Sequence, residues 1–192
     1  MKIFRRELLL LLILLITAFL YISGYRLSGY QAAKAHFGVG KDAELFGEVA
    51  FDWGKVFLFY TDKGPRTVLA KRNNGLLWRA PAAIRYYDHD DLIKTVGGIS
   101  YFDGHETQVT VLAVKSFDPN VAYIEAGPLP HRTKKDVQVG TPLIFHWSGL
   151  AHISINKLNA VALSNEGAPL YEYRYLEGNV FRDEDLRWYA VD

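Results

Sequence analysis

The fold is decided by residues 45–84, which read LFGEVAFDWGKVFLFYTDKGPRTVLAKRNNGLLWRAPAAI. Four short runs in this stretch are rich in Val, Phe, Leu and Tyr, and they cover residues 45–51, 55–60, 66–71 and 76–84. Each connection between the runs contains the glycine or asparagine that tight hairpin turns need for a positive φ. The pattern predicts an antiparallel β meander.

A short helix is predicted just before the meander. Ser28 and Gln31 have the spacing of a capping box, and Gly38 follows the apolar residues that recur at helical intervals. We expect this helix to cover one face of the sheet, because a small sheet needs such a cover to be stable.

Further short strands are predicted downstream of the meander, at residues 97–102, 107–114, 121–126, 143–147, 160–163 and 170–175. Their number and spacing are typical of a β-sandwich. The predicted fold class is therefore mainly β with a short helix (α+β): a helix-plus-meander lobe at 25–93, then a β-sandwich-like lobe at 94–192. The acidic stretch 88–91 marks the boundary, although the two regions could equally share one continuous core.

The N-terminal segment predicts a membrane anchor. Residues 8–24, LLLLLILLITAFLYISG, contain no charge, and Lys2, Arg5 and Arg6 precede them. This pattern favours a transmembrane helix at 8–24, with residues 1–7 in the cytoplasm and the rest of the chain outside. The alternatives are a cleaved signal peptide, which would make the protein secreted, and a buried cytosolic helix; the match to a cleavage site is poor.

Composition removes several classes of function. The chain of 192 residues has a formal net charge of +1, and residues 25–192 alone carry −1, so there is no basic excess that would suit nucleic acid. Cysteine is absent, which excludes disulfides, thiolate catalysis and cysteine zinc sites. No cofactor is expected.

Two stretches carry a resemblance. Residues 48–81, EVAFDWGKVFLFYTDKGPRTVLAKRNNGLLWRAP, together with LYEYRY at 170–175, resemble a family of small, uncharacterised membrane-anchored proteins of Gram-positive bacteria. Residues 109–126, VTVLAVKSFDPNVAYIEA, are similar to strands of bacterial surface β-sandwich modules. The resemblance implies a location and a fold, and it assigns no catalytic residue.

One polar cluster is a candidate metal or hydrolase site. A hard cation can relieve the repulsion between clustered carboxylates. The candidate ligands are Asp88, His89, Asp90, Asp91 and the more distant His105. An EF-hand register from Asp88 would need glutamate at position 99, where Ile99 stands. We therefore favour a solvated linker, and we assign no catalytic or metal residue.

Two further segments are candidate partner surfaces. Tyr171, Tyr173 and Tyr175 alternate along a predicted strand, so they form either an exposed aromatic row or, as we favour, the inward face of the sheet. Arg132, Lys134 and Lys135 lie in a predicted basic loop that would meet wall polymer or lipid headgroups, or remain solvated.

The sequence thus predicts a membrane-anchored, extracytoplasmic module that binds a protein or an envelope component without catalysis. The alternative is an extracytoplasmic hydrolase or metal-binding protein that uses the cluster at 88–91 and His105.

Overall fold

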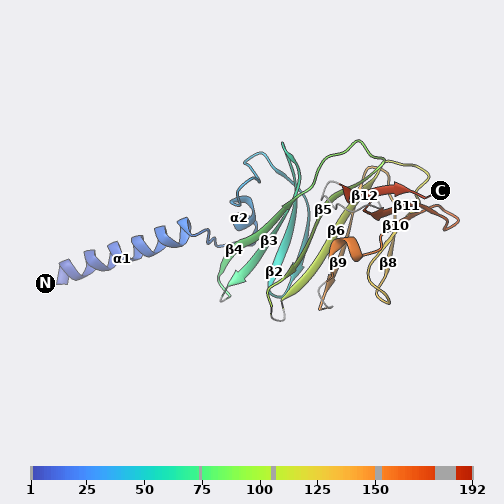
Figure 1. The fold of residues 1–192 in the computed structure, drawn as a ribbon. Coiled ribbons are helices and arrows are strands. Elements are labelled where there is room, and N and C mark those ends of the chain that lie inside the picture. Colours follow the sequence, from blue (N-terminus) through green and yellow to red (C-terminus); the bar gives the residue numbers. More distant parts are fainter. Residues whose placement is uncertain (1, 74, 105–106, 150–152, 176–184, 192) are drawn as a thin grey trace.

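Figure 1 shows the computed structural model of the chain, which describes residues 2–73, 75–104, 107–149, 153–175 and 185–191. The molecule is elongated. Helix α1 (Lys2–Ile22) lies at one end and the C-terminus at the other, with a short helix and three antiparallel sheets stacked between them. The protein is therefore mainly β with short N-terminal helices.

Sheet A is the expected meander, with strand order β1-β2-β3-β4. Its strands are β1 (Glu44–Phe51), β2 (Gly54–Thr61), β3 (Gly64–Asn73) and β4 (Leu77–Arg85). They agree with the four sequence runs to within two residues at every end, because each hairpin is specified locally. In the β2–β3 turn, for example, Gly64 has a φ of +99°, which favours glycine.

Helix α2 (Gly29–Lys34) covers one face of sheet A. The Ser28 hydroxyl accepts a hydrogen bond from the backbone amide of Gln31 at 3.2 Å, which caps the helix as its sequence predicts. The buried side chains of Ala32 and Ala33 pack in one cluster with Phe57 and other side chains of β2 and β3. The helix ends before the expected stop, and Phe37 lies beyond it, 92% exposed.

Sheet B is the central layer and consists of β5 (Ile93–Phe102), β6 (Gln108–Ser116) and β9 (Pro142–Ser148) in the order β5-β6-β9. Residues 109–114 of β6 are all buried. Sheet A covers one face of sheet B, where Val56 and Leu69 share a cluster with Val111. Sheet C covers the other face, so β6 is apolar without the alternation of a half-exposed strand.

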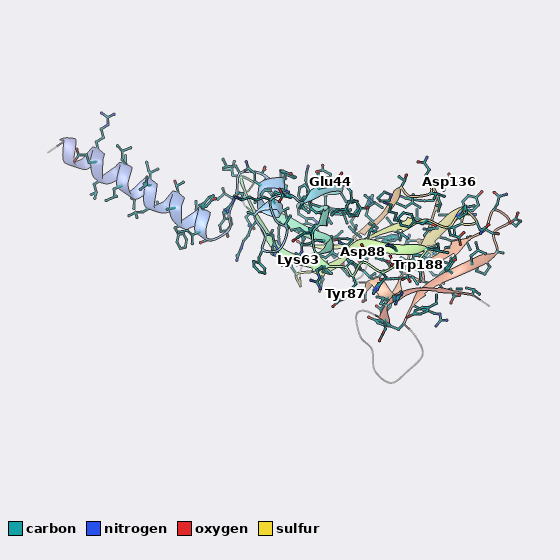
Figure 2. The ribbon with its side chains drawn as sticks, turned by 90° about the horizontal axis from the view of Figure 1, so that it is seen from above. Glu44, Lys63, Tyr87, Asp88, Asp136 and Trp188 are labelled. Atoms are coloured by element: carbon teal, nitrogen blue, oxygen red, sulfur yellow. The ribbon has the colours of Figure 1, made fainter. Side chains whose placement is uncertain are left out.

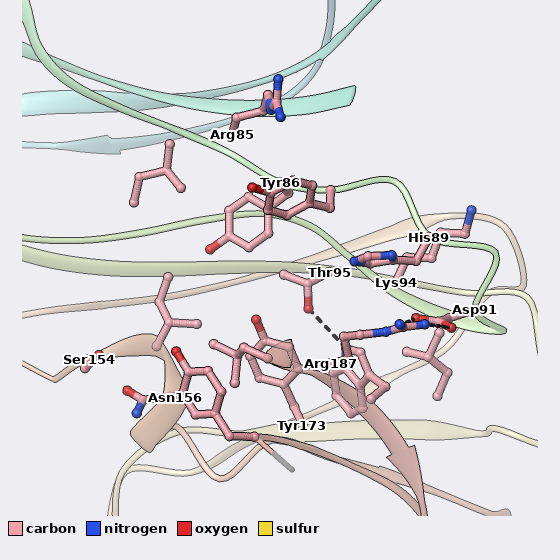
Figure 3. Close-up of a pocket in the computed structure, with 17 residues that line it drawn as sticks. Arg85, Tyr86, His89, Asp91, Lys94, Thr95, Ser154, Asn156, Tyr173 and Arg187 are labelled. Carbon is pink, nitrogen blue, oxygen red and sulfur yellow. Dashed lines mark hydrogen bonds and ion pairs between the residues drawn. The ribbon is translucent and has the colours of Figure 1, made fainter. Parts of the chain in front are cut away.

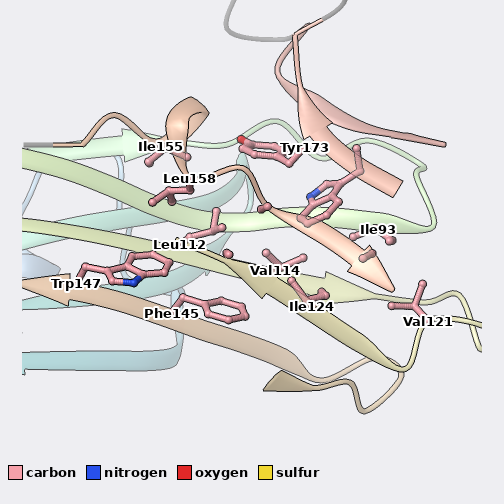
Figure 4. Close-up of a cluster of buried hydrophobic side chains, with 14 residues drawn as sticks. Ile93, Leu112, Val114, Val121, Ile124, Phe145, Trp147, Ile155, Leu158 and Tyr173 are labelled. Atoms are coloured by element: carbon pink, nitrogen blue, oxygen red, sulfur yellow. The ribbon is translucent and has the colours of Figure 1, made fainter. Parts of the chain in front are cut away.

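Sheet C has the strand order β12-β11-β10-β7-β8. Its strands are β7 (Tyr123–Ala126), β8 (Thr133–Asp136), β10 (Val161–Leu163), β11 (Pro169–Arg174) and β12 (Arg187–Ala190), and a 3-10 turn η1 (Ile155–Lys157) precedes β10. The largest buried cluster lies between sheets B and C, where Leu112 and Phe145 meet Ile124 and Leu158 (Figure 4).

The two-lobe division stays a prediction. Its boundary, between residues 93 and 94, falls inside β5. Residues from both sides of that boundary also lie in the same buried clusters; Leu58 of sheet A, for example, packs with Val96 and Ala113 of sheet B.

Helix α1 extends away from the β body (Figures 1 and 2). Its large apolar side chains from Leu8 to Phe19 are each 50–69% exposed. Within the part of the chain that the structure describes, no helix combines the length and the apolar character of a membrane span. After α1, Arg26 pairs with Trp78 of β4 through two backbone hydrogen bonds of 2.8 Å, which attach the helix to sheet A.

Candidate functional site

A cleft of about 340 Å³ opens between the linker that follows β4, the turn η1 and the strands β11 and β12 (Figure 3). Its lining combines aromatic rings with hydroxyl, amide and charged groups, which include Arg85, Tyr86, His89, Asp91, Lys94, Thr95, Ser154, Asn156, Tyr173, Tyr175, Arg187 and Trp188. These residues come from four separate segments of the chain, which the packing of sheets B and C brings together.

The floor of the cleft is aromatic and rigid. The rings of Tyr173 and Trp188 are paired across β11 and β12, with their centroids 5.4 Å apart, and both side chains are buried. The Trp188 indole Nε1 donates to the Thr95 hydroxyl at 3.1 Å. Burial raises the pKa of Tyr173 far above its ordinary value, against the opposing effect of a hydrogen bond with Thr95. The Tyr173 phenol therefore stays neutral, as a packed wall of the site.

The rim of the cleft is held by one ion pair. Arg187 of β12 donates to both carboxylate oxygens of Asp91, with its Nε 3.0 Å from one and its Nη2 2.5 Å from the other (Figure 3). The hydrogen bonds with Asp91 raise the pKa of Arg187 further above its ordinary value. This bidentate contact ties the linker at 86–92 to the last strand and fixes the width of the opening.

The acidic linker does not gather into a metal site. Asp88 pairs with Lys94 at 3.0 Å, Asp91 pairs with Arg187, and the ring of His89 lies 6.1 Å from that of Tyr87. Asp90 is exposed. The repulsion that suggested a bound cation is thus relieved by two protein cations that lie in different directions.

No group of three His, Asp or Glu side chains able to hold a metal occurs within the described ranges. His105 lies outside the described residues, so its part in the predicted site is left as a prediction.

The tyrosine row is not an exposed surface. Tyr173 is only 4% exposed, and the half-buried Tyr171 donates its hydroxyl to Asp118 at 2.8 Å. Tyr175 lines the cleft. The alternation along β11 places these rings toward sheet B, so the row as a whole cannot be the partner surface, although two of its members contribute to the cleft.

The basic segment is an edge strand and not a loop. Lys134 and Lys135 belong to β8, and Lys134 Nζ lies 3.8 Å above the centre of the Tyr123 ring. Lys135 donates to the carbonyl oxygen of Ile144 at 2.6 Å, and Arg132 forms an ion pair with Glu125. These charges therefore serve the packing of β8, which limits their availability to a polymer.

Sequence reasoning missed most of the cleft. It did not single out Thr95, Ser154, Asn156 or Arg187, because no local motif connects positions so far apart in the chain. The available signals were local ones: the acidic linker, which contains His89 and Asp91, and the alternating tyrosines, which include Tyr173 and Tyr175.

The chain matches no protein-family model, no curated protein and no solved structure. Its function is therefore inferred from its own residues.

The cleft contains groups that can bind a ligand. Asp91 is committed to Arg187. The half-buried rings of Tyr86 and Tyr175 line the cleft, and aromatic rings of this kind stack on planar or sugar-like ligands. Ser154 and Asn156 are exposed at its edge, where they can donate and accept hydrogen bonds.

Proposed function

We propose that this protein is a membrane-anchored, extracytoplasmic binding module. In this proposal α1 is the anchor and is held with its N-terminus inside, and the β body lies outside and binds a component of the cell envelope without catalysis. The observation that carries it is the exposure of α1, whose large apolar side chains from Leu8 to Phe19 are not covered by any part of the chain that the structure describes.

Burial in hydrocarbon is the cover that α1 lacks. The apolar part of α1, residues 8–22, is about 23 Å long at 1.5 Å per residue, which is short beside a hydrocarbon core of about 30 Å. The bilayer must therefore thin locally, with Lys2, Arg5 and Arg6 reaching toward the headgroups. Local thinning of the bilayer is required because no helix in the described part of the chain is long and apolar enough to cross a membrane of ordinary thickness.

The β body serves to hold the cleft away from the anchor. Sheet C supplies the aromatic floor and is the layer farthest from α1 (Figure 1). In this proposal residues 94–192 act as a β-sandwich-like lobe that presents the cleft outward. Tethering raises the effective concentration of the module toward ligands near the membrane.

The ligand that fits this cleft is a short neutral glycan segment of the envelope. Sugar rings stack on aromatic faces, and hydroxyl and amide groups at the rim can pair with sugar hydroxyls. The alternative of a hydrolase or metal-binding protein is not favoured by any observation, since Asp91 and Asp88 are paired with cations.

The anchor is tested with Ile16→Arg in the middle of the apolar segment. An arginine at the centre of a span costs about 2.5–3.5 kcal/mol of insertion free energy, so this variant should shift from the membrane fraction toward the soluble fraction of cells. The matched control is Val139→Arg, because Val139 is an exposed apolar residue of the β body. Native chain found in the soluble fraction without detergent would contradict the anchor.

The cleft is tested with chitotetraose, a neutral amino-sugar oligomer, added to the full chain in detergent micelles. The chain has four tryptophans, so the indole N–H signal of Trp188 can be resolved and followed by NMR. We expect this signal to shift, with weaker binding for Asn156→Ala than for Asn165→Ala, which changes an exposed turn outside the cleft. Equal shifts at all four indoles, or none, would contradict a glycan site here.

A further inference from the structure

Charge is distributed unevenly along the sequence of the β body. Residues 25–85, which form α2 and sheet A, contain ten Lys and Arg and five Asp and Glu, a net charge of +5. Residues 86–192 contain nine basic and fifteen acidic residues, a net charge of −6. With the +2 of residues 1–24, these values give the +1 of the whole chain. The basic half is the one adjacent to α1.

A groove lies where α1 meets the body. It measures about 730 Å³ and is lined by the last turn of α1, by α2 and by the start of β4. Arg26 lies at its centre: its guanidinium is 3.9 Å from the centre of the Tyr21 ring and donates to the carbonyl oxygens of Tyr21 and Tyr25 at 2.8 Å. Beside it, the side chain of Leu27 is 80% exposed.

The β3–β4 hairpin extends this surface. Leu76 at its tip is 78% exposed, and Arg72 and Arg79 are exposed on either side of it. The hairpin is next to the exit of α1, because Trp78 is paired with Arg26. Arg72 lies 5.9 Å above the Trp78 ring, and Arg79 lies 5.9 Å above the Tyr25 ring. Aromatic and basic groups thus surround exposed leucines.

We propose that this surface rests against the headgroup layer of an anionic phospholipid bilayer. It consists of Arg26, Leu27, Arg72, Leu76 and Arg79, and we call it the membrane seat; the neighbouring Lys34 is left out because it is half-buried and donates to the carbonyl oxygen of Ala43 at 2.5 Å. The inference rests on the proposed function, since it takes α1 as the anchor. The leucines enter the interface, and the arginines pair with lipid phosphates.

The opposite charge of the far half orients the body. The described residues of 86–192 carry eight basic and ten acidic side chains, a net charge of −2, so the anionic surface attracts the half that carries +5 and not this half, and sheet C and the cleft point away from the membrane. The membrane seat is therefore a second, electrostatic attachment to the bilayer. Together with α1 it fixes the orientation of the β body relative to the membrane.

The absence of cysteine gives a clean test. Leu76→Cys and, as the control at the far end, Asn165→Cys are labelled with an environment-sensitive fluorophore in the full chain. Each is reconstituted into vesicles of phosphatidylcholine alone or of an equal mixture with phosphatidylglycerol. Quenching by a nitroxide on the lipid headgroup is then measured. We expect quenching at position 76 in the anionic vesicles, reduced by high salt, and none at position 165.

Charge variants give the size of the effect. Each basic residue near an anionic surface contributes about a fivefold factor in affinity, so Arg72→Gln with Arg79→Gln should lower the seating equilibrium by roughly 30-fold. The matched control, Lys157→Gln with Arg174→Gln, removes the same charge from the far half and should leave quenching at position 76 unchanged.

The outcomes separate the seat from the anchor. A chain that inserts but shows equal quenching at positions 76 and 165 overturns the seat and leaves the anchor standing. A chain that does not enter vesicles of either composition overturns the proposed function as well. A change at position 76 that follows protein concentration and not lipid charge would identify a second copy as the occupant, and it would also overturn the seat.

Discussion

The hydroxyl of Tyr60 is buried, and it has no hydrogen-bond partner in the described part of the chain. Burial, followed by the charges of Glu44 and Asp88, raises the pKa of Tyr60 above its ordinary value. A buried hydroxyl without a partner costs free energy. Tyr60→Phe should therefore leave the free energy of unfolding unchanged or raise it by up to about 1 kcal/mol, as measured by urea unfolding.

Tyr171→Phe is the matched control for this prediction, because the hydroxyl of the half-buried Tyr171 donates a hydrogen bond to Asp118 at 2.8 Å. Its loss should lower the free energy of unfolding by about 1 kcal/mol. Equal destabilisation by the two substitutions would show that the Tyr60 hydroxyl is satisfied after all.

Asp118 makes the stability of the protein sensitive to acid. Its carboxylate accepts hydrogen bonds from the backbone amide of Asn120 at 2.9 Å and from the Tyr171 hydroxyl at 2.8 Å. The backbone hydrogen bond from Asn120 is the main cause that holds the pKa of Asp118 below its ordinary value of 3.8. The folded state thus binds the proton more weakly than the unfolded state, so this stabilisation is present above about pH 4 and is lost as the pH falls below it.

Asp118→Asn should remove that dependence. Between about pH 5 and pH 2, the free energy of unfolding should fall more steeply for the native chain than for the variant, and the two curves should converge at the acid end. Urea unfolding at several pH values measures this. Parallel curves would show that Asp118 does not contribute to acid sensitivity.

Among the elements, β5 depends on glycine where it crosses sheet A. A Cβ placed on Gly97 would collide with the side chain of Leu58 and lie 2.9 Å from the Thr67 hydroxyl. The neighbouring amide of Gly98 donates to that hydroxyl at 2.8 Å, so the two sheets are in close contact at this point. Gly97→Ala should therefore force the sheets apart and lower the free energy of unfolding by about 1–3 kcal/mol.

A double-mutant cycle identifies the cause. Leu58→Val frees space at the same contact. The double variant should therefore lose less free energy of unfolding than the two single variants lose in total. If the losses of the two single variants simply add, the destabilisation by Gly97→Ala does not come from its contact with Leu58.

The elements also show which parts of the fold are predictable from sequence. The meander was predictable because each hairpin is specified by a local glycine or asparagine between apolar runs. The strands β8 and β12 were missed because they are four-residue elements and β8 is mostly polar, so they depend on neighbours that are distant in sequence. The pairing of Asp91 with Arg187 spans 96 residues, and no spacing rule reaches that far.

For the candidate site, the sequence analysis singled out several residues of the cleft but did not predict that they lie close together. His89 and Asp91 were singled out as acidic-linker residues, and Tyr173 and Tyr175 as a strand pattern, yet all four line one cleft. What joins them is the stacking of sheet C on sheet B through a buried cluster. That packing follows from the shapes of whole sheets, which a pattern of single residues does not determine.

At the scale of the whole molecule, the shared clusters predict cooperative unfolding. Trp78 packs on the α2 side of sheet A, and Trp188 lies in sheet C at the other end of the body. In two variants that keep either Trp78 or Trp188 as the sole tryptophan, with the other three replaced by phenylalanine, fluorescence should report the same urea midpoint. Separated midpoints would instead support the two-lobe division at residue 93.

The order of the layers has a consequence for how the chain is made. A growing polypeptide completes α2 and sheet A by residue 85, but Val56, Leu58 and Leu69 on the inner face of that sheet then have nothing to contact. Their partners arrive with β5 and β6, and β9 closes the central layer only at residue 148. The nascent protein therefore most needs a chaperone while residues 86–148 are being synthesised. During that interval the apolar inner face of sheet A is exposed, because sheet B is not yet complete.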